Sequence, residues 1–166
     1  MHPLNTPGYL REVIRPAVAE GAQAAGRDLT DFDFVINPFT VTGRNADELA
    51  ESRAIIRRHI SFYAATRTYF SVLEHHGWTQ IGEQLVWLSK QGRWAEMPAL
   101  VTDEMLEELA LVGSFEELPE KLAERYSGLA TTTNLVFGPP YAELQPRQRR
   151  MFESLAPIMD ELKRVA

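Results

Sequence analysis

Cysteine is absent from the sequence. Disulfide bonds, iron–sulfur clusters, thiolate zinc sites and thiol catalysis are therefore excluded, and the composition suits a reducing compartment, so we expect a cytoplasmic protein. Long apolar runs are also absent, and the first residues show no basic region with an apolar segment behind it. We expect neither a signal peptide nor a membrane-spanning helix.

Basic residues are too few to give the chain a positive surface. Seventeen Lys and Arg oppose 23 Asp and Glu, for a formal net charge of −6 and a pI near 5.3. Without a basic tract to neutralise phosphates, nucleic acid is an unsuitable partner. The strings of a phosphate-binding loop, a serine nucleophile elbow and a zinc protease helix are missing too, so three common catalytic classes lack support.

What the chain does contain is the material for one globular domain. Its 166 residues are 45% hydrophobic, with 10 Gly and 10 Pro, which is close to the average for folded domains of this length. No repeat, low-complexity segment or shift in charge divides the sequence. We therefore treat residues 1–166 as a single domain.

The first helix signal lies near the amino terminus. Thr6 before Pro7 has the pattern of an N-cap followed by proline at the first helical position. Apolar residues at helical spacing then predict a helix over residues 7–24, which Gly26 ends. Pro16 falls inside this helix and should kink or locally break it.

A longer helix is predicted after Asn45, which forms a capping-box pattern with Glu48, and its apolar stripe extends to Tyr63. Residues 68–112 continue in helical periodicity but are interrupted by three glycines and Pro98. This segment therefore reads as an insert of short helices joined by turns.

Three more helices follow from caps and periodicity. Thr102 predicts a cap for a helix over residues 103–111, and Ser114 with Glu117 predicts a capping box that opens the next helix. An apolar stripe over residues 146–166 predicts the last one.

Two segments have the pattern of buried parallel strands. The first covers residues 32–42 and the second residues 134–137, ahead of a Gly-Pro-Pro turn. Their alternation with helices predicts an α/β fold with parallel strands. Since two strands leave two open edges, we expect them to need further strands from elsewhere, and hence an incomplete chain.

Several short strings occur in a fixed order between residues 2 and 130. They are Gly26–Asp28, Phe62–Tyr69, Gly77–Trp78, Asp103–Leu106, Val112–Glu117 and Arg125–Leu129. In this order they resemble the carboxyl-terminal half of the luciferase-like monooxygenase superfamily, and within it most closely the oxidoreductases that depend on the deazaflavin coenzyme F420.

The resemblance implies a helix-rich, carboxyl-terminal part of a (β/α)8 TIM barrel with about two parallel strands and a helical insert. Residues 32–41 would be strand seven and residues 134–137 strand eight. Coenzyme F420, or alternatively FMN, would bind at the carboxyl-terminal mouth and carry out hydride transfer or monooxygenation on a small-molecule substrate. It would do so only when the missing half, from an amino-terminal half chain or a homo-oligomer, completes the barrel.

Chemistry in such barrels lies at the carboxyl ends of the strands. This indicates Thr40, Thr42 and Arg44, which end and follow the first strand, as candidate cofactor or substrate contacts. His2 would join them as a hydrogen-bond donor if it ends strand six. A strand end with its turn, and a frayed terminus, are the structural alternatives.

Tyr63 and Tyr69 flank Arg67 at the end of the long helix, where two phenols and a cation would close over an anionic or aromatic ligand. A packed core tyrosine is the alternative for Tyr63. The adjacent His75 and His76 point about 100° apart on a helix and lack a third ligand, so no metal site is expected. No residue is assigned to catalysis.

A second function belongs to another class. The chain would be a non-catalytic, mainly helical binding or oligomerisation module derived from such a barrel, with its open strand edges paired across copies.

Overall fold

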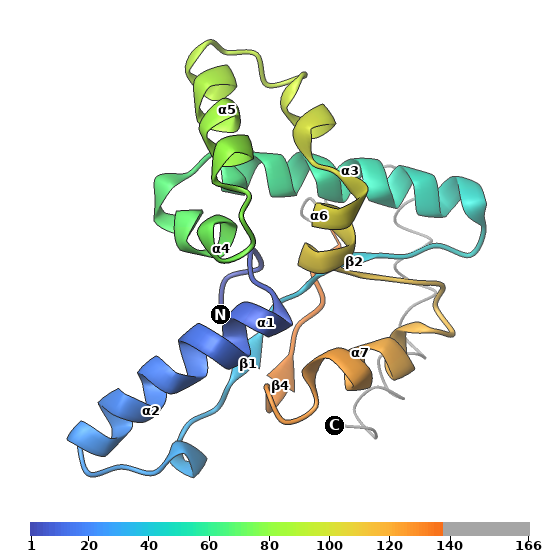
Figure 1. The fold of residues 1–166 in the computed structure, drawn as a ribbon. Coiled ribbons are helices and arrows are strands. Elements are labelled where there is room, and N and C mark those ends of the chain that lie inside the picture. The colour runs from blue at the N-terminus through green and yellow to red at the C-terminus, as the bar shows by residue number, and fades with distance from the viewer. Residues whose placement is uncertain (138–166) are drawn as a thin grey trace.

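A computed structural model describes residues 1–137, and helices surround a few short strands (Figure 1). The helices are α1 (Pro7–Tyr9), the π-helix η1 (Leu10–Ile14), α2 (Arg15–Ala24), η2 (Leu29–Asp31), α3 (Ala46–Ala64), η3 (Arg67–Tyr69), α4 (Phe70–His75), α5 (Thr79–Lys90), η4 (Met97–Leu100), α6 (Asp103–Leu109) and α7 (Leu118–Tyr126). The strands are β1 (Val35–Ile36), β2 (Phe39–Val41), β3 (Ala110–Val112) and β4 (Thr132–Thr133). The helix predicted over residues 146–166 lies outside the described residues.

The helix predicted over residues 7–24 is confirmed as the continuous run α1, η1 and α2. The Thr6 hydroxyl accepts a hydrogen bond from the Tyr9 amide at 3.1 Å and caps its start. Pro16 provides no amide donor, and the wide π-helical turn of η1 lies just before it. The expected local break therefore appears as a change in helix type.

The long helix α3 begins where its cap predicts. The Asn45 side chain accepts a hydrogen bond from the Glu48 amide at 3.0 Å. The Glu48 carboxylate accepts from the Arg44 amide at 2.9 Å, one residue earlier than in the standard capping box. Ile56 and Ile60, on the predicted apolar stripe, are fully buried against the strands.

All strand pairing in the described part of the chain is parallel. In one pair, β1 runs beside β4, with Val35 opposite Thr132; in the other, β2 runs beside β3, with Phe39 opposite Ala110. Phe39 also forms an isolated bridge with Val136. Because a strand has one neighbour on each edge, residues 35–41 lie between β3 on one side and residues 132–136 on the other.

Two strand predictions and one helix prediction need correction. The segment predicted as one strand over residues 32–42 is two short strands separated at Pro38, which has no amide to donate. The strand predicted over residues 134–137 starts earlier, at β4, and keeps only the Val136 bridge. The helix predicted over residues 103–111 ends at Leu109, and β3 follows without a break.

Consecutive strands of a barrel are parallel neighbours. Residues 35–41, predicted as strand seven, run parallel beside residues 132–136, which overlap the segment predicted as strand eight, and the unpredicted β3 lies on the other edge. The barrel itself stays a prediction. Both edges of β2 are paired within the chain, and Val41 and Ala110 are fully buried. The sequence did not predict β3 as a companion of β2, and the expectation that the strands need further strands from elsewhere stays a prediction.

The predicted helical insert is confirmed as η3, α4, α5 and η4. Gly77 and Gly92 have φ values of 73° and 70° and end α4 and α5, a backbone region that glycine enters without strain. Gly82 is not the expected break, because α5 continues through it. Within residues 1–137 no helix is both long and apolar enough to span a membrane.

Gly43, between β2 and α3, permits a close approach of two backbone segments. A Cβ atom at this position would lie 2.6 Å from the Leu49 amide nitrogen and 2.8 Å from the Glu48 carbonyl carbon. We predict that Gly43→Ala lowers the free energy of unfolding by about 2 kcal/mol. The control Gly21→Ala, in α2 with nothing near its Cβ position, should raise it by about 1 kcal/mol. Urea denaturation measures both, and equal effects of the two substitutions would contradict the close approach.

Burial lowers the pKa of His2, His59 and His76 below the usual histidine value. The unfolded chain then binds more protons than the folded chain as the pH falls through the unfolded histidine pKa of about 6.5. We predict that the free energy of unfolding decreases between pH 8 and pH 5.5, as measured by urea denaturation at each pH. His59→Gln should reduce this pH dependence, and an unchanged slope would exclude His59 as a source.

Candidate functional site

The candidate site lies where β2 and β3 end. Residues 43–45 follow β2 and residues 113–114 follow β3, and an open pocket of about 310 Å³ lies between these two loops. Arg53 from α3 and Lys121 from α7 also line it. Parallel strands with ends at one edge bring these loops together, as the fold class predicts.

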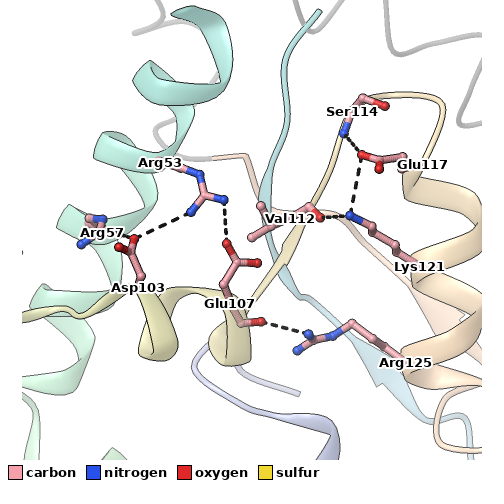
Figure 2. Close-up of polar contacts among 9 residues, drawn as sticks. All are labelled: Arg53, Arg57, Asp103, Glu107, Val112, Ser114, Glu117, Lys121 and Arg125. Atoms are coloured by element: carbon pink, nitrogen blue, oxygen red, sulfur yellow. Dashed lines mark hydrogen bonds and ion pairs between the residues drawn. The ribbon is translucent and has the colours of Figure 1, made fainter. Parts of the chain in front are cut away.

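One side of the pocket is closed by ion pairs between α3 and α6 (Figure 2). Arg53 Nη2 lies 2.6 Å from Glu107 Oε1, and Arg53 Nη1 lies 4.0 Å from Asp103. Arg57 also pairs with Asp103 and donates to the Val101 carbonyl at 2.5 Å. These contacts attach the start of α6 to α3.

The other side is closed by α7 (Figure 2). Lys121 donates to the Val112 carbonyl at 3.0 Å, and its ammonium lies 3.6 Å from the Glu117 carboxylate. The Ser114 amide donates to the same carboxylate at 2.7 Å. The pKa of Glu117 is lowered by the Ser114 hydrogen bond first and by the Lys121 charge second. The Ser114–Glu117 part of the predicted capping box is thus present, although α7 itself begins at Leu118.

Arg125 connects α7 to α6 through hydrogen bonds to backbone carbonyls. Its guanidinium donates to the Glu107 carbonyl at 2.9 Å and to the Glu108 carbonyl at 2.6 Å, in the last turn of α6, where helix carbonyls lack intrahelical partners. Sequence reasoning missed Arg53, Lys121 and Arg125. Only the Glu117–Lys121 spacing of four residues gave a usable signal.

Of the predicted residues at this end, Thr42 differs from its neighbours. The Thr40 hydroxyl donates to the Pro38 carbonyl at 3.2 Å, and Arg44 forms a two-pronged pair with Glu48 at 3.1 and 2.7 Å. Thr42 is fully buried, and its hydroxyl has no hydrogen-bond partner among residues 1–137. Such a group costs free energy unless a partner satisfies it.

His2, Tyr63 and Tyr69 form a second group. The His2 ring stacks on Tyr69 with centroids 4.1 Å apart and meets Tyr63 edge-on at 4.6 Å. The Tyr63 ring lies 6.1 Å from Phe39, the first residue of β2. Because α3 returns antiparallel to β2, its last turn reaches the amino end of the strand, opposite the pocket.

Arg67 does not close over a ligand with the two tyrosines. Its guanidinium is paired with both oxygens of Glu83, at 2.5 and 2.8 Å, and covers the Phe70 ring at 4.6 Å. The residues predicted from the sequence are therefore divided between the two ends of β2, and those at the amino end are engaged with one another or with carboxylates.

The described residues of this pocket leave it open and do not by themselves enclose a flavin. The pocket volume of about 310 Å³ is at the lower limit of small-molecule sites, which span about 300–1,000 Å³ and bury most of the ligand. Its charged side chains pair with one another, as described above. We therefore derive no chemical step from these residues alone.

Metal binding finds no geometric support in the part of the chain that the structure describes, which holds no cluster of three ligating side chains. His76 instead shares a hydrogen bond of 2.8 Å with the Thr6 hydroxyl and stacks on Trp78 at 4.4 Å.

The unpartnered hydroxyl of Thr42 gives a paired test. Thr42→Val replaces a buried hydroxyl that lacks a partner, so the free energy of unfolding should rise by about 1 kcal/mol. Thr40→Val removes a hydroxyl that is hydrogen-bonded, so the free energy of unfolding should fall by about 1 kcal/mol. Urea denaturation measures both changes. A loss of stability in Thr42→Val would show that the hydroxyl is satisfied in solution.

Comparison with known proteins gives three kinds of match. The family described as luciferase-like monooxygenase matches residues 1–132. Uncharacterized proteins of Mycobacterium tuberculosis and Mycobacterium bovis are 36% identical over 136 residues, 82% of this chain and 40% of theirs. The 5,10-methylenetetrahydromethanopterin reductase of Methanopyrus kandleri is 28% identical over 130 residues, 78% of this chain and 36% of that enzyme.

The chain spans about 40% of the length of the curated relatives that it matches. The match to the family covers most of the chain and includes α3, the helical insert, the pocket loops and α7. The chain belongs to the luciferase-like monooxygenase family.

Proposed function

We propose that this chain is the carboxyl-terminal portion of a luciferase-like, F420-dependent oxidoreductase and acts on a small molecule in the cytoplasm. FMN is the alternative cofactor. The cofactor, when bound, carries the hydride transfer or the activation of oxygen, and the protein supplies position and electrostatics. In this proposal the pocket at the ends of β2 and β3 borders the cofactor or its substrate.

The observation that carries this proposal is the buried, unpartnered hydroxyl of Thr42. Thr42 directly precedes Gly43, which lines the pocket. In a (β/α)8 barrel, the catalytic and binding residues lie at the carboxyl ends of the strands and in the loops that follow them. A polar ligand group that accepts or donates at Thr42 would remove the cost of the unsatisfied hydroxyl.

The proposal assigns the rest of the cofactor site to other strands. The pocket is open and small, and its cations Arg44, Arg53 and Lys121 are already paired with carboxylates. The curated relatives contain more than twice the matched length. The isolated chain is therefore expected to bind a flavin weakly or not at all.

A chimaera tests this proposal. The part of the Mycobacterium tuberculosis relative that precedes the matched region is fused to this complete chain, and fluorescence titration measures binding of F420 and of FMN. We predict saturable F420 binding by the chimaera at micromolar concentrations and none by the chain alone. The fusion is expected to supply the strands and loops that, in this proposal, form the rest of the cofactor site.

Thr42→Val in the chimaera should weaken F420 binding or lower the turnover of reduced F420, whereas Thr40→Val serves as the matched control. Saturable F420 binding by the isolated chain would refute the assignment of the cofactor site to other strands. A folded chimaera that binds neither cofactor would favour a non-catalytic binding or oligomerisation module.

A further inference from the structure

An apolar groove lies on the side of α3 that faces η4, outside the strands and the site described above. The segment that contains η4 crosses over α3 (Figure 1). The groove has a volume of about 560 Å³ and is lined by residues of α3 and of the segment 94–98. This volume is within the range of small-molecule sites.

Two aromatic side chains form the exposed wall of the groove. Phe62 is 54% exposed and Trp94 is 51% exposed, and their ring centroids lie 6.1 Å apart with an angle of 36° between the planes. Met97, only 1% exposed, lies beneath, and Pro98 also lines the groove. Aromatic rings held with half of their surface open provide an apolar contact face at low entropic cost.

Arg58 supplies one positive charge at the edge of this groove. α3 carries three arginines, and Arg53 and Arg57 both pair with carboxylates of α6. For Arg58, the structure of residues 1–137 gives no ion pair and no side-chain hydrogen bond, and its side chain is exposed. A carboxylate or sulfonate on a bound molecule would have the complementary charge.

The size of the groove favours a small ligand over a protein. Seven residues line it, whereas a stable protein interface uses about 20–30 residues on each side. Trp87 is also 54% exposed, with the Arg93 guanidinium 5.2 Å from its ring centroid, but it is not among the residues that line the groove.

We propose that the groove between α3 and η4 binds a small organic anion with a flat aromatic body. The body packs on Phe62 and Trp94, and the anionic group pairs with Arg58. This site is separate from the pocket at the strand ends and does not depend on the proposed oxidoreductase function.

The test uses 8-anilinonaphthalene-1-sulfonate, an aromatic sulfonate, with the full chain. We expect saturable one-site binding, measured by dye fluorescence and by energy transfer from tryptophan. Trp94→Ala should weaken binding at least about tenfold, because it removes half of the aromatic wall. Arg58→Gln should weaken it about threefold, as for an exposed ion pair, and Arg58→Lys should restore most of the loss.

Two controls separate the charge from the apolar contact. N-phenyl-1-naphthylamine, the same dye without the sulfonate, should bind the native chain and Arg58→Gln equally. Arg27→Gln, at an exposed arginine paired with Asp31 away from the groove, should leave sulfonate binding unchanged. The dye should also raise the urea midpoint of the native chain, which shows that it binds the folded state.

Two results would overturn the proposal. One is equal affinity of the sulfonate dye for the native chain and for Arg58→Gln. The other is a dimer of the native chain that Trp94→Ala converts to monomer in analytical ultracentrifugation, since the groove would then be the contact between two copies.

Discussion

The parallel pairing of residues 35–41 with two neighbours is the constraint on which the rest of the structure depends. A buried strand must place every backbone amide and carbonyl in a hydrogen bond, because water cannot reach them. β3 satisfies one edge, and residues 132–136 satisfy the other through hydrogen bonds such as that from the Thr40 amide to the Val136 carbonyl at 2.7 Å. The helices α3 and α7 are then positioned by the strands that they follow.

The charged side chains at the strand ends complete this arrangement by tying helices to one another. Arg53 joins α3 to α6, and Arg125 joins α7 to the last turn of α6. Each such exposed pair contributes little to stability by itself. Their effect is to hold the two pocket loops at a defined separation, and the charge of Arg53 is neutralised by the carboxylates of Asp103 and Glu107.

Family membership and local geometry provide different information about this chain. The family relationship comes from the order of short strings along the chain, and it extends over residues 1–132. The geometry contributes one buried hydroxyl, at Thr42, without a partner among residues 1–137, and an open pocket of about 310 Å³. The apolar groove beside η4 is a separate feature that neither the family nor the strand ends account for.

Local signals in the sequence determined the helix starts and the α/β class. The caps Thr6, Asn45 and Thr102 act within three residues, so their interactions are encoded locally and are present in the structure. β3 was not predictable, because a short apolar run after Leu109 fits a helix or a strand equally well.

Only the tertiary structure decided which strand lies between the others and which site residues meet. Strand order and ion pairs such as Arg67–Glu83 join segments that are separated along the chain. The predicted site residues form two separate groups because α3 returns antiparallel along β2. One group is His2, Tyr63 and Tyr69, and the other is Thr40, Thr42 and Arg44. Periodicity and capping describe neighbours within a few residues, and they carry no information about such long-range pairing.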